Sequence, residues 1–180
     1  MEACLADIRA LNSLKFDQFA EALRPLFEAA APLADALYAA RPFTSYAELI
    51  VTAESLAHGM SFADQVAVLA AHPRIGANPE AVSATSYAEQ GYSSESGTHP
   101  SELQSVYNHL ADLNHAYEQH FGFRFVVFVN RRPKAQIIKV LEARLRNPRE
   151  QELRTGLREM FFIARDRLAA LTAPPHGRDP

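Results

Sequence analysis

Hydrophobic residues return every three or four positions along most of the chain, which is the period of a helix with one buried face. The clearest stripe consists of Phe16, Phe19, Ala20, Leu23, Leu26 and Phe27. Ser45 and Glu48 have the spacing of a capping box that opens a further helix. The pattern predicts helices over residues 16–30, 33–43, 46–58, 61–72, 101–120, 133–147 and 148–173, the last two with proline in the first turn.

Residues 121–129, FGFRFVVFV, break the helical period. Alternating aromatic residues followed by a β-branched run are typical of a strand. No second convincing strand exists to pair with this segment, so its backbone groups need side-chain partners or a ligand. The sequence therefore predicts an all-α, single-domain helical bundle with one extended segment, about residues 121–129, buried among the helices.

Composition and charge narrow the class of protein. A chain of 180 residues with 48% hydrophobic content can form one domain with a core, here expected over residues 1–172 with a flexible polar tail at 173–180. A formal net charge of -3 disfavours nucleic acid and anionic membranes as partners, and no apolar run could span a bilayer. The single cysteine, Cys4, indicates a reducing, cytoplasmic location without disulfides.

Motifs for common cofactors are missing from the sequence. The seven histidines form no HExxH pattern, no CxxC pair occurs, and no GxGxxG or P-loop spelling is present. We therefore expect neither a metal nor a nucleotide cofactor. A Gly-x-Ser-x-Gly nucleophile motif is absent as well.

The best candidate for chemistry is His72, at the end of a predicted helix and followed by Pro73. Proline restricts the backbone of the residue before it, which would fix the direction of the imidazole. A histidine at a helix end also has a structural explanation, because it is stabilised by the helix dipole. The following segment, residues 73–100, is long and weakly periodic, as functional or disordered segments are.

Two further candidates have equally plain structural explanations. Glu89 could face a pocket and pair with His72, but Ser86 and Glu89 also spell a capping box. Arg167 could turn its planar guanidinium inward to bind a carboxylate or a ureido or imide oxygen. Arg158 and Arg165 on the same predicted helix compete with it for this role.

Taken together, four stretches in this order resemble a known family: AAHPRIGA (70–77), SYAEQ (86–90), LNHAYEQHFGFRFVVFV (113–129) and IARDRLAAL (163–171). The family is that of the 2-oxo-4-hydroxy-4-carboxy-5-ureidoimidazoline (OHCU) decarboxylases of uric acid degradation, and the resemblance covers about residues 14–172. The sequence departs from the family at Arg124, where the family usually has the proline of FGFPF, and in a small insertion at Gly97–Pro100.

The resemblance implies an all-α fold and a site formed by these motifs. The implied catalytic residues are His72, Glu89 and Arg167. The implied substrate-binding residues are Pro73, Ser86, Tyr87, Ala88, Glu89 and Gln90, together with main-chain contacts from Phe125, Val126, Val127, Phe128 and Val129.

The implied activity is decarboxylation of OHCU to S-allantoin without a cofactor, with His72 protonating one face of the intermediate, in a protein that is commonly a homodimer. Two alternatives stay open at this point. One is a helical protein–protein interaction domain that uses exposed phenylalanines between residues 121 and 162 as anchors. The other is a related decarboxylase acting on a different ureido-imidazoline.

Overall fold

The computed structural model describes residues 5–77, 82–91 and 100–173, and within these ranges the chain is all-α with no strand. The all-α prediction is therefore confirmed. The helices are α1 (Ile8–Ser13), α2 (Phe16–Phe27), α3 (Ala31–Ala39), α4 (Tyr46–Gly59), α5 (Phe62–Ala70), α6 (Ala84–Glu89), α7 (Pro100–Phe121), α8 (Lys134–Arg144) and α9 (Arg149–Thr172).

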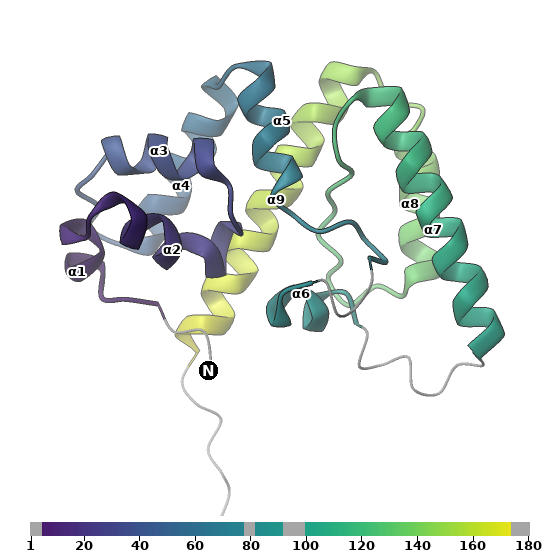
Figure 1. Cartoon of the computed structure of the whole chain (residues 1–180), viewed down its shortest axis with the longest axis horizontal. Coiled ribbons are helices and arrows are strands. Elements are labelled where there is room, and N and C mark those ends of the chain that lie inside the picture. Colours follow the sequence, from purple (N-terminus) through teal and green to yellow (C-terminus); the bar gives the residue numbers. More distant parts are fainter. Residues whose placement is uncertain (1–4, 78–81, 92–99, 174–180) are drawn as a thin grey trace, which may run out of the picture.

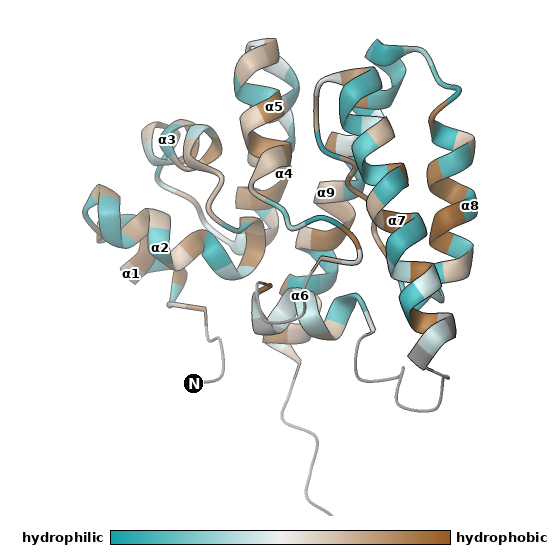
Figure 2. Ribbon diagram, turned by 45° about the vertical axis from the view of Figure 1, so that its right-hand side comes forward, coloured by the Kyte–Doolittle hydropathy of each residue, from teal (hydrophilic) through white to brown (hydrophobic). Residues whose placement is uncertain are grey.

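The long helix α9 runs through the middle of the molecule (Figure 1). Helices α2, α4 and α5 pack against it on one side, and α7 packs with α8 on the other. Figure 2 shows largely hydrophobic turns on α4 and α5 and mostly hydrophilic turns on α7. In the predicted stripe of α7, Leu110 and Tyr117 are fully buried, so this helix contributes to the core along one narrow face.

Local capping explains several helix starts, although three predicted signals are wrong in detail. Ser45 accepts a hydrogen bond from the Glu48 backbone at 3.1 Å, as the capping box requires. Ser86 is not a cap, because Ser83 occupies that position in α6 and accepts from the Ser86 backbone. Pro133 and Pro148 are N-cap residues of α8 and α9 and do not lie in the first turn.

The segment after α7 is extended and buried, as predicted. Phe123, Phe125, Val126, Val127 and Val129 are all buried, although the segment pairs with no strand. It passes between α7, α8 and α9, since its partners come from all three helices. The core thus holds a length of backbone whose polar groups must be satisfied in another way.

Charged side chains replace the missing strand partner. Arg144 donates to the Val126 carbonyl at 2.9 Å, and Glu159 accepts from the Phe128 backbone at 2.9 Å. Arg144 in turn binds Glu152, a fully buried carboxylate that also accepts from the hydroxyl of Tyr117. Burial and then the hydrogen bond to Glu152 raise the pKa of Tyr117, which keeps this phenol protonated.

The burial of the aromatic residues contradicts the alternative of a protein–protein interaction domain anchored by exposed phenylalanines. Phe121, Phe123, Phe125 and Phe161 are at most 3% exposed, so they are core residues and not surface anchors. Phe162 alone in this group is a strongly exposed phenylalanine, at 41%. No helix within the described ranges is long and apolar enough to cross a membrane. Residues 97–99 of the predicted insertion and 174–180 of the predicted tail lie outside the described residues.

Candidate active site

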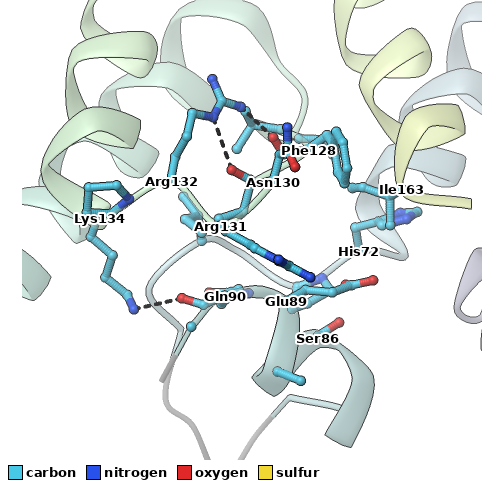
Figure 3. Close-up of a pocket in the computed structure, with 18 of the residues that line it drawn as sticks. His72, Ser86, Glu89, Gln90, Phe128, Asn130, Arg131, Arg132, Lys134 and Ile163 are labelled. Carbon is cyan, nitrogen blue, oxygen red and sulfur yellow. Dashed lines mark hydrogen bonds between the residues drawn. The ribbon is translucent and has the colours of Figure 1, made fainter. Parts of the chain in front are cut away.

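A cavity of about 810 Å³ lies where the loop after α5, helix α6, the extended segment and α9 meet (Figure 3). One wall is polar and carries His72, Ser86, Glu89 and Arg167. Apolar side chains of residues 125–129 line the cavity as well, together with Leu103, Val106 and Ile163. Segments from widely separated parts of the chain thus bring most of the predicted site residues to one cavity.

The loop that carries His72 is held at both ends. Arg124 of the extended segment donates to the carbonyls of Ala70, at 2.5 Å, and His72. The guanidinium at this position therefore ties the extended segment to the end of α5. The backbone of His72 is fixed as a result, and the residue is only 3% exposed.

Gln90 holds the other end of the same loop. Its side-chain oxygen accepts from the Gly76 backbone at 2.8 Å, and its amide nitrogen donates to the Arg74 carbonyl at 3.3 Å. Gly76 has a φ of 73°, and a Cβ there would lie only 3.0 Å from Leu110, so glycine suits this turn. Gln90 lines the cavity, but its amide is engaged by the loop.

The imidazole of His72 has no protein partner among the described residues. Both ring nitrogens are buried and make no hydrogen bond. Burial, and next the positive charge of Arg167, lower the pKa of His72 from its ordinary value of 6.5 to about 4. The carboxylate of Glu28 and the carbonyl of Val68 act in the opposite direction, although the carbonyl does not reach hydrogen-bond geometry. The free protein therefore holds a neutral imidazole at pH 7.

Arg167 points inward from α9 and binds Glu89 through two parallel hydrogen bonds. Its Nε donates to Oε1 at 2.7 Å and its Nη2 to Oε2 at 2.8 Å, which is the strong fork-to-fork geometry. Burial acts against the charge of Arg167, but the hydrogen bond with Glu89 raises its pKa. Its Nη1 is buried and has no partner among the described residues, which leaves this nitrogen free to donate to a ligand.

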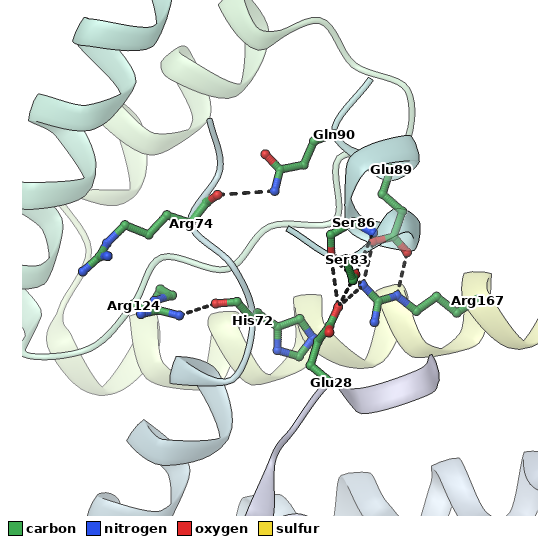
Figure 4. A network of polar contacts seen from close by, with 9 residues as sticks. All are labelled: Glu28, His72, Arg74, Ser83, Ser86, Glu89, Gln90, Arg124 and Arg167. Atoms are coloured by element: carbon green, nitrogen blue, oxygen red, sulfur yellow. Dashed lines mark hydrogen bonds and ion pairs between the residues drawn. The ribbon is translucent and has the colours of Figure 1, made fainter. Parts of the chain in front are cut away.

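Sequence reasoning missed Glu28, which the structure places in the same cluster (Figure 4). Glu28 accepts from Nη2 of Arg167 at 2.9 Å and from the hydroxyl of Ser86 at 2.9 Å. It follows α2 immediately and looks like a surface carboxylate at a helix end, so no local pattern could have revealed it. Its backbone has φ 56° and ψ -148°, a conformation that residues other than glycine rarely adopt.

A group of basic residues that line the cavity was also missed: Arg131, Arg132 and Lys134. Arg132 donates to the carbonyls of Phe128 and Val129, and Lys134 donates to the Gln90 carbonyl at 3.0 Å. Arg131 makes no hydrogen bond or ion pair within the described part of the chain, and its side chain extends into the cavity in the direction of Glu89 (Figure 3). Its φ of 58°, next to 46° at Asn130, is the left-handed conformation.

The remaining predicted residues divide into two groups. Pro73, Ala88 and residues 125–129 line the cavity together with His72, Ser86, Glu89, Gln90 and Arg167. Tyr87 does not line it, and this residue is 37% exposed. Of the three competing arginines, Arg167 alone lines the cavity, whereas Arg165 pairs with Glu54 and Arg158 is exposed.

The chemistry that this arrangement allows is proton transfer beside a fixed pair of opposite charges. His72 is the only titratable imidazole that lines the cavity among the described residues, and Arg167 with Glu89 can orient polar groups of a ligand. Within the same ranges, no three histidine, cysteine, aspartate or glutamate residues gather in a way that could hold a metal ion.

Comparison with known proteins agrees with this geometry. The chain matches the OHCU decarboxylase family over residues 12–169. It is 32% identical to the 2-oxo-4-hydroxy-4-carboxy-5-ureidoimidazoline decarboxylase of Haloferax volcanii over 162 residues, 90% of this chain and 94% of that protein. It is 31% identical to the uric acid degradation bifunctional protein PucL of Bacillus subtilis, over 88% of this chain but 31% of that protein.

A solved structure shows the same relationship in three dimensions. A crystal structure of an OHCU decarboxylase in the presence of (S)-allantoin superposes with a TM-score of 0.63 and 28% identity, covering 82% of this chain and 95% of that one. The matched residues 12–169 include every residue that forms the polar wall of the cavity. The chain therefore belongs to the OHCU decarboxylase family.

Proposed function

We propose that this protein decarboxylates OHCU to S-allantoin in uric acid degradation, with His72 as proton donor. The observation that carries the proposal is the group of three buried polar atoms without protein partners: both ring nitrogens of His72 and Nη1 of Arg167. Buried polar atoms are rarely left unpaired, so their presence on a cavity wall supports a polar ligand there. Family membership supports OHCU as that ligand.

The reaction needs a substrate that is oriented and an intermediate that is protonated on one face. When the bond to the carboxylate breaks, its electron pair delocalises into the neighbouring imine and carbonyl groups, so no metal or other electron sink is required. Arg167 and Glu89 orient the hydroxyl and ureido groups, and the free Nη1 donor faces the oxygen where negative charge develops. Such preorganised donors stabilise a transition state because they need no rearrangement during the reaction.

His72 must acquire a proton before it can deliver one. Its low pKa keeps it neutral in the free protein at pH 7. The substrate carries a carboxylate, and a negative charge beside an imidazole raises the pKa of that imidazole. Substrate binding therefore favours the imidazolium that the protonation step consumes, and the fixed backbone of His72 sets the face from which the proton arrives.

The extended segment and the basic residues complete the substrate contacts. The N–H and C=O of Val127 and the N–H of Val129 make no hydrogen bond within the described part of the chain, and both residues line the cavity. These groups bind the ureido and ring amide functions. Arg131, which has no protein partner among the described residues, attracts the carboxylate of the substrate into the cavity.

The test is to generate OHCU in place from urate with the two preceding enzymes and to follow S-allantoin by circular dichroism. We expect the wild-type protein to accelerate the appearance of S-allantoin well above the spontaneous, racemising decay. His72→Asn, which is close to isosteric, should fold normally and lose nearly all of this acceleration. Wild-type turnover by His72→Asn would exclude the histidine as proton donor, and a wild-type protein without acceleration would exclude the activity itself.

The proposal includes a homodimer acting in the cytoplasm, as the family resemblance implies. Light scattering coupled to size-exclusion chromatography at micromolar concentration should give twice the mass of the 20.0 kDa chain. A monomer mass under the conditions of full activity would exclude the dimer as the active form. Fractionation of the source cells should recover the protein with cytoplasmic markers.

A further inference from the structure

The polar cluster behind His72 contains more carboxylates than it needs to neutralise its arginine. Glu28 of the α2 end, Glu89 of α6 and Arg167 of α9 are joined by hydrogen bonds of 2.7–2.9 Å. Their side chains are 15%, 24% and 2% exposed, so solvent screens them incompletely. The bidentate pair of Arg167 with Glu89 is neutral, which leaves the charge of Glu28 without a cation of its own in this cluster.

The geometry places that surplus charge next to His72. In Figure 4 the Glu28 carboxylate lies between the imidazole of His72 and the guanidinium of Arg167. Its position is further fixed by Ser86, which donates to it at 2.9 Å, and by Ser83, which donates at 3.3 Å. Side chains from α9, from α6 and from the N-cap of α6 thus bind one carboxylate that does not line the cavity itself.

The backbone of Glu28 is a second, independent observation. A φ of 56° with a ψ of -148° is a conformation that favours glycine, and here a residue with a charged side chain adopts it. Strained backbone persists only where surrounding contacts impose it, and it is concentrated at functional sites. Here Glu28 is the C-cap residue of α2, its N–H donates to the Arg24 carbonyl, and its carboxylate is bound by Arg167 and Ser86.

We propose that Glu28 is a positioning residue of the active site, whose carboxylate provides the counter-charge for the His72 imidazolium. When His72 takes up a proton, the cluster holds two carboxylates and two cations and becomes neutral. Without Glu28, protonation of His72 would leave a buried excess of positive charge beside Arg167. Glu28 acts through His72 and does not touch the substrate. This assignment deepens the proposed function and rests on His72 being the proton donor.

The charged groups around His72 determine the sign of the effect. Arg167 of α9 and Arg124 of the extended segment disfavour the imidazolium, whereas Glu28 favours it. Glu89 faces the same cluster, but both of its oxygens are engaged by Arg167. Removing the charge of Glu28 therefore lowers the pKa of His72 further, so that the imidazolium is lost at a lower pH.

The experiment compares Glu28→Gln with the matched control Glu54→Gln. Glu54 is also a carboxylate paired with an arginine of α9, but its partner is Arg165 and neither residue lines the cavity. With OHCU generated in place, kcat of Glu28→Gln should fall below that of wild type, and the ratio of the two should grow as the pH rises through the pKa of His72. Above that pKa, each unit by which the pKa is lowered should reduce kcat about tenfold. Glu54→Gln should keep the wild-type pH profile. Glu28→Asp, which keeps the charge, should stay closer to wild type than Glu28→Gln.

A measurement without turnover separates this proposal from the proposed function. Histidine labelled with ¹⁵N reports the protonation of His72 directly, with His72→Asn serving to assign its signals. Between pH 8 and about 4.5 the wild-type signal should begin to shift toward imidazolium, and in Glu28→Gln it should not. Identical titration curves in the two proteins, or a uniform loss of kcat at every pH, would overturn the counter-charge role whether or not OHCU is the substrate.

Discussion

Arg167 and Glu89 face each other through two parallel hydrogen bonds of 2.7 and 2.8 Å, although 78 residues separate them in the chain. A guanidinium bound in this way is fixed in orientation as well as in position. The third nitrogen, Nη1, is then directed by the pair and has no other partner among the described residues. The orientation of this donor is the basis of the first prediction.

Arg167→Lys keeps the positive charge but removes the planar fork that binds both oxygens of Glu89. We expect kcat/KM to fall about 100-fold, because a misplaced donor of this kind is costly in the transition state. The steady-state rate of S-allantoin formation measures this. Arg165→Lys, two positions earlier and paired with Glu54 outside the cavity, is the control and should behave as wild type. Equal rates for the two variants would argue against an orienting role of Arg167.

Arg131→Gln should raise KM several-fold and leave kcat nearly unchanged. The exposed cation attracts the anionic substrate, so its contribution decreases with ionic strength. Measuring kcat/KM between about 0.02 and 0.5 M salt should show a steep dependence for wild type and a shallower one for the variant. Arg158→Gln removes the same charge from an exposed position that does not line the cavity, and it should keep the wild-type dependence.

Glu28→Gly should be more stable than Glu28→Ala by about 1 kcal/mol, since glycine adopts a φ of 56° without strain and alanine does not. Both variants lack the carboxylate, so the difference between their free energies of unfolding reports the strain of the backbone at this position. Urea unfolding gives the two free energies of unfolding. Within helices, alanine is normally more stabilising than glycine. If Glu28→Ala proves more stable than Glu28→Gly, the backbone of Glu28 is unstrained.

Stability should depend on pH through His72. Its pKa is about 4 in the folded protein and 6.5 when unperturbed, so the unfolded chain binds the proton more tightly. The contribution of His72 to stability is therefore complete above about pH 6.5 and is lost as the pH falls toward 4, by about 2 kcal/mol at pH 4.5. Urea unfolding at pH 7 and 4.5 should show a smaller loss for His72→Gln than for wild type. Equal losses would contradict the buried neutral imidazole.

Glu152→Leu should destabilise the protein by about 3 kcal/mol, because it leaves the charge of Arg144 buried without a counter-charge. The double variant Arg144→Met with Glu152→Leu removes both charges and should recover a large part of this loss. Urea unfolding of the single and double variants measures both values. If the double variant is no more stable than the single one, Arg144 stabilises the fold chiefly through its bond to the Val126 carbonyl.

Much of the fold could be predicted because it depends on neighbours in the sequence. The stripe from Phe16 to Phe27 gives α2, and the spacing of Ser45 and Glu48 gives the start of α4. The short helices α1 and α6 escaped prediction, since six residues contain too few periods to be recognised. The extended segment was visible as a break in the period, but its partners, such as Arg144 and Glu159, were not.

The site divides in the same way. By itself the sequence determined the longer helices, the place of the extended segment and the restricted backbone of His72, because helical period and the restriction by Pro73 act over a few residues. Only the tertiary structure decided that Arg167, and not Arg165, enters the cavity. It also decided that Glu28 binds Arg167, although the two residues are 139 positions apart in the chain. Contacts between side chains so far apart depend on how whole helices pack, and local periodicity carries no information about them.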